Sequence, residues 1–210
     1  MPDKESTWKF AEDFVVESDD IIAARNRSIE LGIDAISPAT GAQLGVLVAA
    51  SRATAVIEIG TGVGVSGLWM LAGAPDATLT SIDIEPEYQQ AARKSFLAAG
   101  IAANRLRLIA GRARDVLPRM NENSYDVVFV DADPASVIEY VEHGLRLVRP
   151  GGTVVVAHAL WRDRVADPTK RDATVTAYRT LLSEIAASDA VLSAVSPVGD
   201  GLLQLTRRVE

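Results

Sequence analysis

The sequence predicts an α/β fold in which helices cover a mostly parallel sheet. Short apolar segments alternate with longer segments of helical spacing, as in parallel strands joined by right-handed crossovers. The first apolar segment runs directly into a glycine-rich turn. The 210 residues, 48% of them hydrophobic, suffice for one sizeable core but not for two comfortable domains. We therefore expect a single domain over 1–210, in which 1–36 form a helical extension.

Two amphipathic helices are expected in this extension, over 7–17 and 19–31. Apolar side chains alternate there with charged ones at helical spacing. Ser6 and either Ser18 or Asp19 are suitable N-caps. The sequence does not determine whether these helices cover the mouth of a binding site, pack on the sheet or contact a second subunit.

The stretch from 55 to 67 organises the chain. Residues 55–59 are apolar apart from Glu58, as in a strand that is buried on both faces. Three glycines follow, at positions 60, 62 and 64, and apolar helical spacing begins at Val65. Glycine permits positive φ and the close approach of a ligand to the backbone. We therefore expect a cradle for a nucleotide-like ligand, with the carboxylate of Glu58 facing a cation.

The remaining elements follow in order. We expect a turn at 37–41 and a helix from 40 to about 51, strands at 79–84, 105–110, 125–131 and 153–157, and helices over 85–99, up to 120, and over 135–147. A helix from about 171 to 187 precedes two segments, 191–196 and 202–206, that are joined by a glycine turn. This pair is typical of a hairpin, so the last strand should be antiparallel to its neighbour.

The composition excludes several functions. The formal net charge is −7 and the pI is near 4.9, which argues against nucleic acid as a partner because duplex binding needs clustered basic residues. We interpret the basic residues at 105, 107, 112 and 114 as a solvated face. There is no cysteine, so disulfides and thiolate metal sites are excluded. The polar N-terminus and the lack of a long apolar stretch predict a cytoplasmic protein that does not insert into membranes.

Polar residues gather where the predicted strands end, which is where ligands of an open parallel sheet bind. The residues at these ends are Glu58 with Gly60, Asp83, Arg112 to Arg114, Asp131, Asp133 and His158. Asp83 has the position at which an acid accepts hydrogen bonds from ribose hydroxyls, although it could instead cap the helix that follows. No Gly-Lys-Ser/Thr motif for a triphosphate is present. The expected cofactor therefore contains a ribose and a positive charge, with little phosphate.

Several motifs together resemble a known family. They are Glu58-Ile-Gly-Thr-Gly, Ser81-Ile-Asp83, Val130-Asp-Ala-Asp133, Arg149-Pro-Gly-Gly152, Leu160-Trp161, Asp167-Pro168 and Gly199-Asp-Gly201. In this order and spacing they are similar to the S-adenosylmethionine-dependent O-methyltransferases of the catechol and caffeoyl-coenzyme A type. The resemblance extends from Ser37 to Arg208. It implies a Rossmann-like seven-stranded sheet of order 3-2-1-4-5-7-6, bound S-adenosylmethionine, a homodimer, and methylation of a hydroxyl on a small acceptor such as an aromatic compound.

The resemblance also implies a role for each matching residue. It places Ile36 and Ser37 at the methionine end of the cofactor, Glu58, Gly60, Thr61 and Ser66 around its amino-acid and ribose region, Asp83 at the ribose hydroxyls, Ile84 and Ala113 beside the adenine, Asp133 near the methionine and Asp131 near the acceptor. A cationic cofactor suits a pocket rimmed by carboxylates.

The chain departs from this family at the metal site. Relatives that use a divalent metal take one ligand from the position of Asp131 and two from an Asp-Asn pair after the fifth strand, where this chain has Ala157-His158. Mg²⁺ and Ca²⁺ prefer oxygen ligands, so Asp131 with one imidazole is a poor site. Pro134 replaces the lysine base of the catechol-type enzymes. We therefore expect catalysis without a metal.

Without a metal, a base has to take the proton of the acceptor hydroxyl. We predict that His158 is this base, held by Asp131 or Asp133, because it lies where the metal ligands are missing. It could equally be an inert residue that fills this space. The other histidine, His143, is interpreted as a helix-terminal charge. Trp161 could stack on a flat acceptor or serve only in packing.

Other functions remain open at this point. The chain could bind S-adenosylmethionine without catalysing a reaction, because the metal ligands and the lysine are missing. The spacing Gly62-x-Gly64-x-x-Gly67 also fits the dinucleotide pattern of an NAD-dependent oxidoreductase, although this alternative leaves Glu58 unexplained. A glycine-rich turn can also be purely structural.

Overall fold

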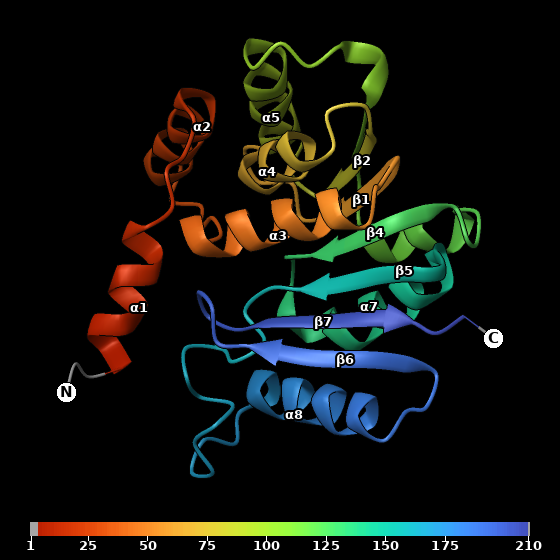
Figure 1. The fold of residues 1–210 in the computed structure, drawn as a ribbon. Coiled ribbons are helices and arrows are strands. Elements are labelled where there is room, and N and C mark those ends of the chain that lie inside the picture. The colour runs from red at the N-terminus through yellow and green to blue at the C-terminus, as the bar shows by residue number, and fades with distance from the viewer. Residues whose placement is uncertain (1–3, 210) are drawn as a thin grey trace.

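The sheet has seven strands in the order that the resemblance implies. The computed structural model describes residues 4–209, and Figure 1 shows its strands in the order β3-β2-β1-β4-β5-β7-β6. Their bounds are β1 Ala55–Ile59, β2 Thr78–Asp83, β3 Leu106–Ala110, β4 Tyr125–Val130, β5 Val148–Val156, β6 Val191–Ser196 and β7 Leu202–Arg207. Neighbouring strands from β3 to β5 are parallel, whereas β7 is antiparallel to β5 and β6. The predicted α/β class, strand order and antiparallel last strand are confirmed.

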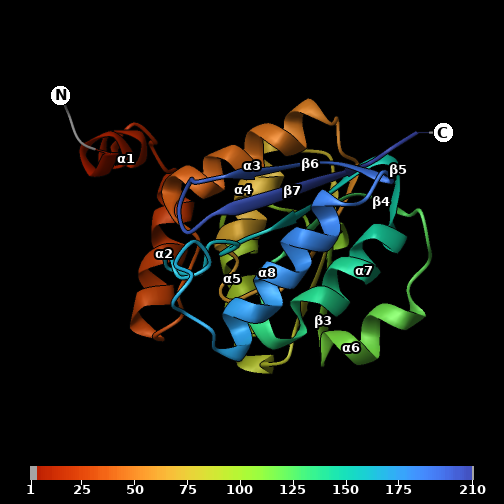
Figure 2. The same ribbon diagram turned by 90° about the horizontal axis from the view of Figure 1, so that it is seen from below.

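Helices cover both faces of the sheet (Figure 2). Their bounds are α1 Lys4–Asp13, α2 Asp19–Glu30, α3 Pro38–Ala50, α4 Val65–Gly73, α5 Pro86–Ala98, α6 Ala113–Val116, α7 Val137–Leu147 and α8 Ala173–Ala186. Buried side chains of α2 to α5 pack on one face, together with Val56 of β1, and those of α6 to α8 pack on the other, together with Ile57. Central strands covered on both faces have the nearly continuous apolar sequence seen here.

The register of three central strands aligns their carboxyl ends. Ile59 of β1 pairs with Ile82 of β2 and with Val130 of β4. The residues that follow these strands therefore start at the same edge of the sheet. This alignment brings the glycine-rich turn, Asp83 and Asp131 close together.

The N-terminal helices differ somewhat from their prediction. Ser18 caps α2 as expected, but Ser6 lies inside α1 and is not its N-cap. The predicted turn at 37–41 is wrong, because α3 already begins at Pro38. Ser37 is its N-cap and accepts a hydrogen bond from the backbone nitrogen of Thr40 (3.2 Å). Proline suits this position because its fixed φ is helical and its missing donor is not needed there.

Two later elements also differ. The helix predicted to end at Met120 is a single turn, α6, followed by a 3-10 turn at Leu117–Arg119 that contains Pro118. β5 begins at Val148 and includes Arg149-Pro-Gly-Gly, which we had expected to lie between a helix and a strand. A register shift between β4 and β5 accommodates these residues, and the side chain of Arg149 bonds to Asp126 (2.6 Å). Of the helices described between residues 4 and 209, none combines the length and hydrophobicity that a membrane span requires.

Candidate functional site

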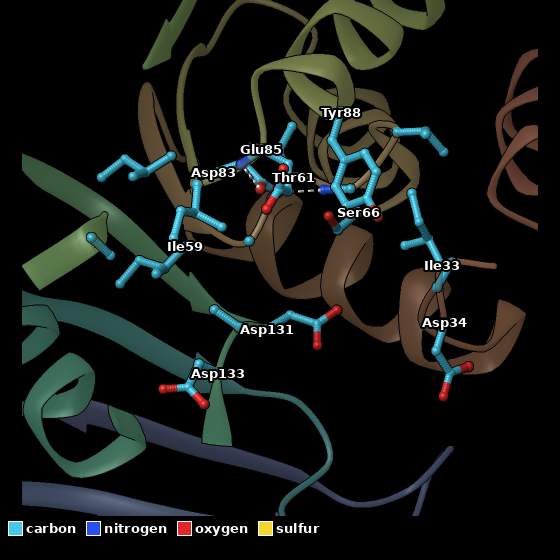
Figure 3. A pocket seen from close by; sticks show the side chains of 18 of the residues that line it. Ile33, Asp34, Ile59, Thr61, Ser66, Asp83, Glu85, Tyr88, Asp131 and Asp133 are labelled. Carbon is cyan, nitrogen blue, oxygen red and sulfur yellow. Dashed lines mark hydrogen bonds between the residues drawn. The ribbon is translucent and has the colours of Figure 1, made fainter. Parts of the chain in front are cut away.

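A cavity of about 480 Å³ opens at the carboxyl ends of β1, β2 and β4 (Figure 3). Of the residues predicted to bind a cofactor, it is lined by Ile36, Gly60, Thr61, Ser66, Asp83, Ile84, Ala113 and Asp133, and also by Asp131. The structure thus brings together residues from six separate segments of the chain. The predicted concentration of polar groups at the strand ends is present.

Gly60 permits the close passage of the first turn across the end of β4. Its φ is +95°, and a Cβ atom at this position would lie 1.8 Å from the carbonyl oxygen of Asp131. Two more glycines with positive φ follow, and Gly64 is the N-cap of α4. Only glycine combines this backbone conformation with this proximity.

Asp83 connects the glycine-rich turn to β2. One carboxylate oxygen accepts hydrogen bonds from the backbone nitrogens of Thr61 (2.9 Å) and Gly62 (3.0 Å), as Figure 3 shows in part. The other oxygen accepts a hydrogen bond from the backbone nitrogen of Glu85 (2.9 Å). Asp83 therefore shapes the turn and lines the cavity. The N-cap of α5 is Glu85, so the alternative in which Asp83 caps this helix is wrong, while its contact with a ribose stays a prediction.

Glu58 lies beneath the cavity and does not line it. Its side chain is fully buried and accepts hydrogen bonds from the hydroxyls of Ser66 and Ser81, both at 2.7 Å. Burial raises the pKa of Glu58 to about 8, although the two serine hydrogen bonds act in the opposite direction. The carboxyl group is connected to the cavity through Ser66 and, by way of Ser81, through Thr61. The expected contact between Glu58 and a cation stays a prediction, and the position of Glu58 beneath the cavity does not favour a direct one.

A second cavity, of about 310 Å³, adjoins the first. Asp34, Ala35 and Ile36 line both cavities. Arg25 anchors this shared wall, because its guanidinium group binds the carbonyl oxygen of Ile36 (2.7 Å) and the carboxylate of Glu17 (2.6 and 2.7 Å). Ser37, which was predicted to contact the cofactor, lines only the second cavity.

His158 lies between two carboxylates where these cavities meet. Its Nε2 is 3.4 Å from Oδ1 of Asp131, and its Nδ1 is 3.3 Å from Oδ2 of Asp200. Burial raises the pKa of Asp131, an effect that the neighbouring His158 opposes. Asp133 instead bonds to the backbone nitrogen of Ala135 (3.2 Å) and the hydroxyl of Ser136 (2.9 Å). Of the two partners predicted for His158, the structure places Asp131 beside it.

Trp161 lines neither cavity. Its ring stacks on Tyr178 of α8, with 5.8 Å between the ring centroids, and it packs against the buried cluster beneath. The tryptophan in the second cavity is Trp8 of α1. This helix lies apart from the sheet, beside the N-terminus of α3 (Figure 1). Glu12 fixes it there, because its carboxylate accepts hydrogen bonds from the Ser37 hydroxyl (2.8 Å) and the Ala39 backbone nitrogen (2.9 Å).

Sequence reasoning missed several residues of the site. Asp34 follows no predicted strand, Asp200 lies in the predicted hairpin turn and not at the end of a parallel strand, and Trp8 precedes the whole sheet. Arg112 and Arg114, which we interpreted as a solvated face, are exposed but line the rim of the first cavity.

The comparisons with known proteins agree with this arrangement. A family model described as O-methyltransferase matches residues 15–209. A protein of Mycobacterium ulcerans that is provisionally named an O-methyltransferase is 48% identical over 198 residues, which cover 94% of this chain and 88% of that protein.

Two solved structures extend the comparison. A protein of Corynebacterium glutamicum is 31% identical, with a TM-score of 0.90, and the match covers 98% of this chain and 97% of that one. The O-methyltransferase TomG of Streptomyces achromogenes, involved in tomaymycin synthesis and solved in complex with SAM, is 29% identical, with a TM-score of 0.85 over the full length of both chains. The family model covers most of the sequence, and the Mycobacterium relative is similar along nearly its whole length. The chain therefore belongs to the O-methyltransferase family.

Proposed function

We propose that this protein transfers the methyl group of S-adenosylmethionine to a hydroxyl of a small aromatic acceptor, without a divalent metal. The observation that carries the proposal is the pair of adjoining cavities with His158 at their junction. The first cavity would hold the cofactor and the second the acceptor. TomG, with which the chain shares its fold over the full length, was solved with SAM, which supports the choice of cofactor.

The residues of the first cavity suit the parts of this cofactor. Asp83 retains acceptor capacity for one ribose hydroxyl, because a carboxylate has about four lone-pair positions and three are used by backbone donors. Ile84 and Ala113 offer apolar contacts for the adenine. Asp131 and Asp133 provide negative charge at the other end, where the sulfonium and the amino group would lie.

The protein's contribution to the reaction is to orient the acceptor and to take a proton. Bound S-adenosylmethionine supplies a methyl group on a cationic sulfur, which keeps the electron pair of the broken carbon–sulfur bond. The walls of the second cavity would hold the acceptor oxygen in line with that carbon. Nε2 of His158 would accept the hydroxyl proton as the new oxygen–carbon bond forms. Trp8 would provide the aromatic wall on which a flat acceptor stacks.

The donor set around Asp131 does not suit a divalent metal. Across residues 4–209, no cluster of three or more His, Asp or Glu side chains has an arrangement that could bind one. Asp131 and His158 supply one oxygen and one nitrogen, and Ala157 supplies no side-chain ligand. Hard divalent cations need a larger oxygen shell than this pair provides.

The test is methyl transfer from isotopically labelled S-adenosylmethionine to a panel of catechols and phenols, with either EDTA or Mg²⁺ present. We expect product in both conditions at the same turnover number. Turnover that requires Mg²⁺ would contradict the metal-free mechanism. A thermal shift with S-adenosylmethionine but no product from any acceptor would favour a binding protein. A shift with NAD alone would favour an oxidoreductase.

The role of His158 is tested with His158→Ala. We expect kcat to fall by about 10²-fold or more, while the affinity for S-adenosylmethionine stays unchanged, because this is the usual contribution of a general base. Unaltered turnover would remove His158 from the mechanism.

We also propose that the protein is a homodimer, as the resemblance implies. Large apolar side chains are exposed on α1, directly after it and on α2, among them Phe10, Phe14 and Ile29. Exposed apolar surface of this kind is typical of protein interfaces.

A further inference from the structure

We propose that Asp200, in the turn between β6 and β7, is a positioning residue that fixes the tautomer and the orientation of the His158 ring. This inference rests on the proposed role of His158 as a base. It assigns a function to a turn that is remote in sequence from the glycine-rich segment and from β4.

The two nitrogens of His158 are in different situations. Among the described residues, the contact between Nδ1 and Asp200 satisfies hydrogen-bond geometry at 3.3 Å. The contact between Nε2 and Asp131, at 3.4 Å, is within ion-pair distance only. The side chains of His158 and Asp200 are 23% and 21% exposed, so bulk water only partly screens their interaction. The ring is therefore tethered at Nδ1 and available at Nε2.

Backbone contacts hold the turn next to His158. The nitrogens of Ala159 and Leu160 donate to the carbonyl oxygens of Gly201 and Asp200, both at 3.0 Å. Gly201 permits this proximity, since a Cβ atom there would lie 2.6 Å from the backbone nitrogen of Leu160. His158 itself has a φ of +57°, which directs the chain out of β5 toward this turn. The position of Asp200 relative to the imidazole is thus set by the backbone.

The carboxylate of Asp200 is also fixed at its second oxygen. Oδ1 accepts a hydrogen bond from the backbone nitrogen of Arg162, while Oδ2 faces His158. The backbone N–H of Arg162 can only donate, so Oδ1 has to accept. An ionised Oδ2 can likewise only accept, so it favours the ring tautomer that carries a proton on Nδ1. A carboxylate meets both requirements, whereas an amide can accept at one oxygen only.

This arrangement determines which nitrogen can act as the base. A carboxylate at Nδ1 retains the proton there, so the lone pair of the neutral ring lies on Nε2. Nε2 faces Asp131 at the junction of the two cavities, where the acceptor hydroxyl would react. When Nε2 takes the acceptor's proton, the imidazolium forms beside a negative charge that stabilises it. A histidine base oriented by a carboxylate is a known arrangement in other enzyme classes.

Asp200→Asn is the variant that tests the proposal. When the asparagine amide donates a hydrogen bond to Nδ1, the lone pair of the neutral ring lies on Nδ1 and the proton on Nε2. Nε2 then cannot accept the proton of the acceptor hydroxyl. We expect kcat with catechol to fall by about 10²-fold or more, with the KM for catechol and the Kd for S-adenosylmethionine within about twofold of wild type. With 4-nitrocatechol, whose hydroxyl is far more acidic, we expect a much smaller loss because less help from a base is needed. Asp189→Asn, at an exposed aspartate before β6, is the matched control and should behave as wild type.

A direct readout of the tautomer does not depend on activity. The chain has only two histidines, so ¹⁵N NMR signals of the rings can be assigned with His143→Gln. We expect neutral His158 to carry its proton on Nδ1 in the wild type and on Nε2 in Asp200→Asn. An Nε2-protonated ring in the wild type, or equal losses of kcat with both acceptors, would overturn the proposal. If the tautomer is as expected but His158→Ala keeps full activity, the base assignment in the proposed function fails instead.

Discussion

Gly60 is the residue at which the fold of the site is most sensitive to a single added methyl group. In Gly60→Ala the new Cβ would overlap the carbonyl oxygen of Asp131, 1.8 Å away, in a backbone conformation with φ of +95°. Gly100→Ala is a matched control, because Gly100 also has positive φ (+76°) but no atom within 4 Å of the added Cβ. We expect Gly100→Ala to lower the free energy of unfolding by about 1 kcal/mol, from backbone strain alone. Gly60→Ala should lower the free energy of unfolding by about 3 kcal/mol or more. Chemical denaturation measures both variants, and equal losses of unfolding free energy would contradict a steric role of Asp131 at this position.

Glu58 makes the stability of the cofactor-free protein depend on pH. Its pKa is raised from 4.5 to about 8, so folding favours its protonated form. The stabilisation is fully present below pH 4.5 and is lost as the pH rises through 8. In Glu58→Gln this dependence is removed. We therefore expect the wild type to lose unfolding free energy relative to Glu58→Gln as the pH rises from 5.5 to 8.5. Denaturation with urea at each pH measures this difference.

Asp126 should not interfere with that measurement. Its burial would raise its pKa, but hydrogen bonds from Thr54, Ala55 and Arg149 outweigh this effect and lower it. A depressed carboxylate pKa contributes stability that is lost only as the pH falls below the ordinary range of aspartate. The two groups therefore act in separate pH windows. If the free energy of unfolding depends on pH in the same way in the wild type and in Glu58→Gln, the role given to Glu58 is contradicted.

Single residues could be predicted from the sequence where they directly follow a strand. Asp83 and Asp131 were found this way, because parallel strands end at the same edge whatever the loops do. Asp34 and Asp200 could not be found, since their positions depend on how loops dock against α2 and β5. The buried state of Glu58 also escaped prediction, because its partners Ser66 and Ser81 lie on two other elements.

At the scale of elements, Trp161 has the packing role that the sequence left open, and Trp8 is the tryptophan that lines the second cavity. Both occur in segments that sequence patterns describe poorly, the N-terminal helix and the loop after β5. Trp161 was recognised because it follows His158 closely, yet the loop turns its ring toward α8. Trp8 fits an amphipathic stripe, and nothing local indicates that α1 docks beside the start of α3 and lines the second cavity. Contacts between elements decide both cases.

The two roles are separable by experiment. Trp8→Ala should raise the KM for an aromatic acceptor by about tenfold, because it removes a stacking contact worth about 1 kcal/mol and some apolar contact. The Kd for S-adenosylmethionine should not change. Trp8→Phe should restore most of the affinity. Trp161→Ala should instead lower the free energy of unfolding by about 2–3 kcal/mol through lost packing on Tyr178. If Trp161→Ala instead raises the KM for the acceptor and leaves the free energy of unfolding unchanged, Trp161 and not only Trp8 contacts the acceptor.

At the scale of the whole molecule, α1 has two faces with different surroundings. Trp8 and Glu12, one turn apart, face the second cavity and the start of α3. Phe10 and Phe14, also one turn apart, lie on the opposite side, because two residues of a helix correspond to about 200° of rotation. Their side chains are 74% and 78% exposed. A helix with both faces apolar is normally covered on both, and the proposed homodimer would supply the missing cover.

This predicts that Phe10 and Phe14 determine the oligomeric state. Burying each phenylalanine contributes about 1.5–3 kcal/mol, and a symmetric dimer buries each of them twice. Phe10→Ser with Phe14→Ser should therefore weaken dimerisation by on the order of 10³-fold or more, so that light scattering finds a monomer where the wild type is a dimer. Val209→Ser, at an exposed apolar residue that follows β7, should leave the dimer intact. A wild type that stays monomeric at every concentration would refute the homodimer. A double variant that stays dimeric would place the interface elsewhere.

Because Trp8 lies on the same helix as Phe10, loss of the dimer should also raise the KM for the acceptor. The cofactor cavity is built from the sheet edge, so the affinity for S-adenosylmethionine should stay unchanged.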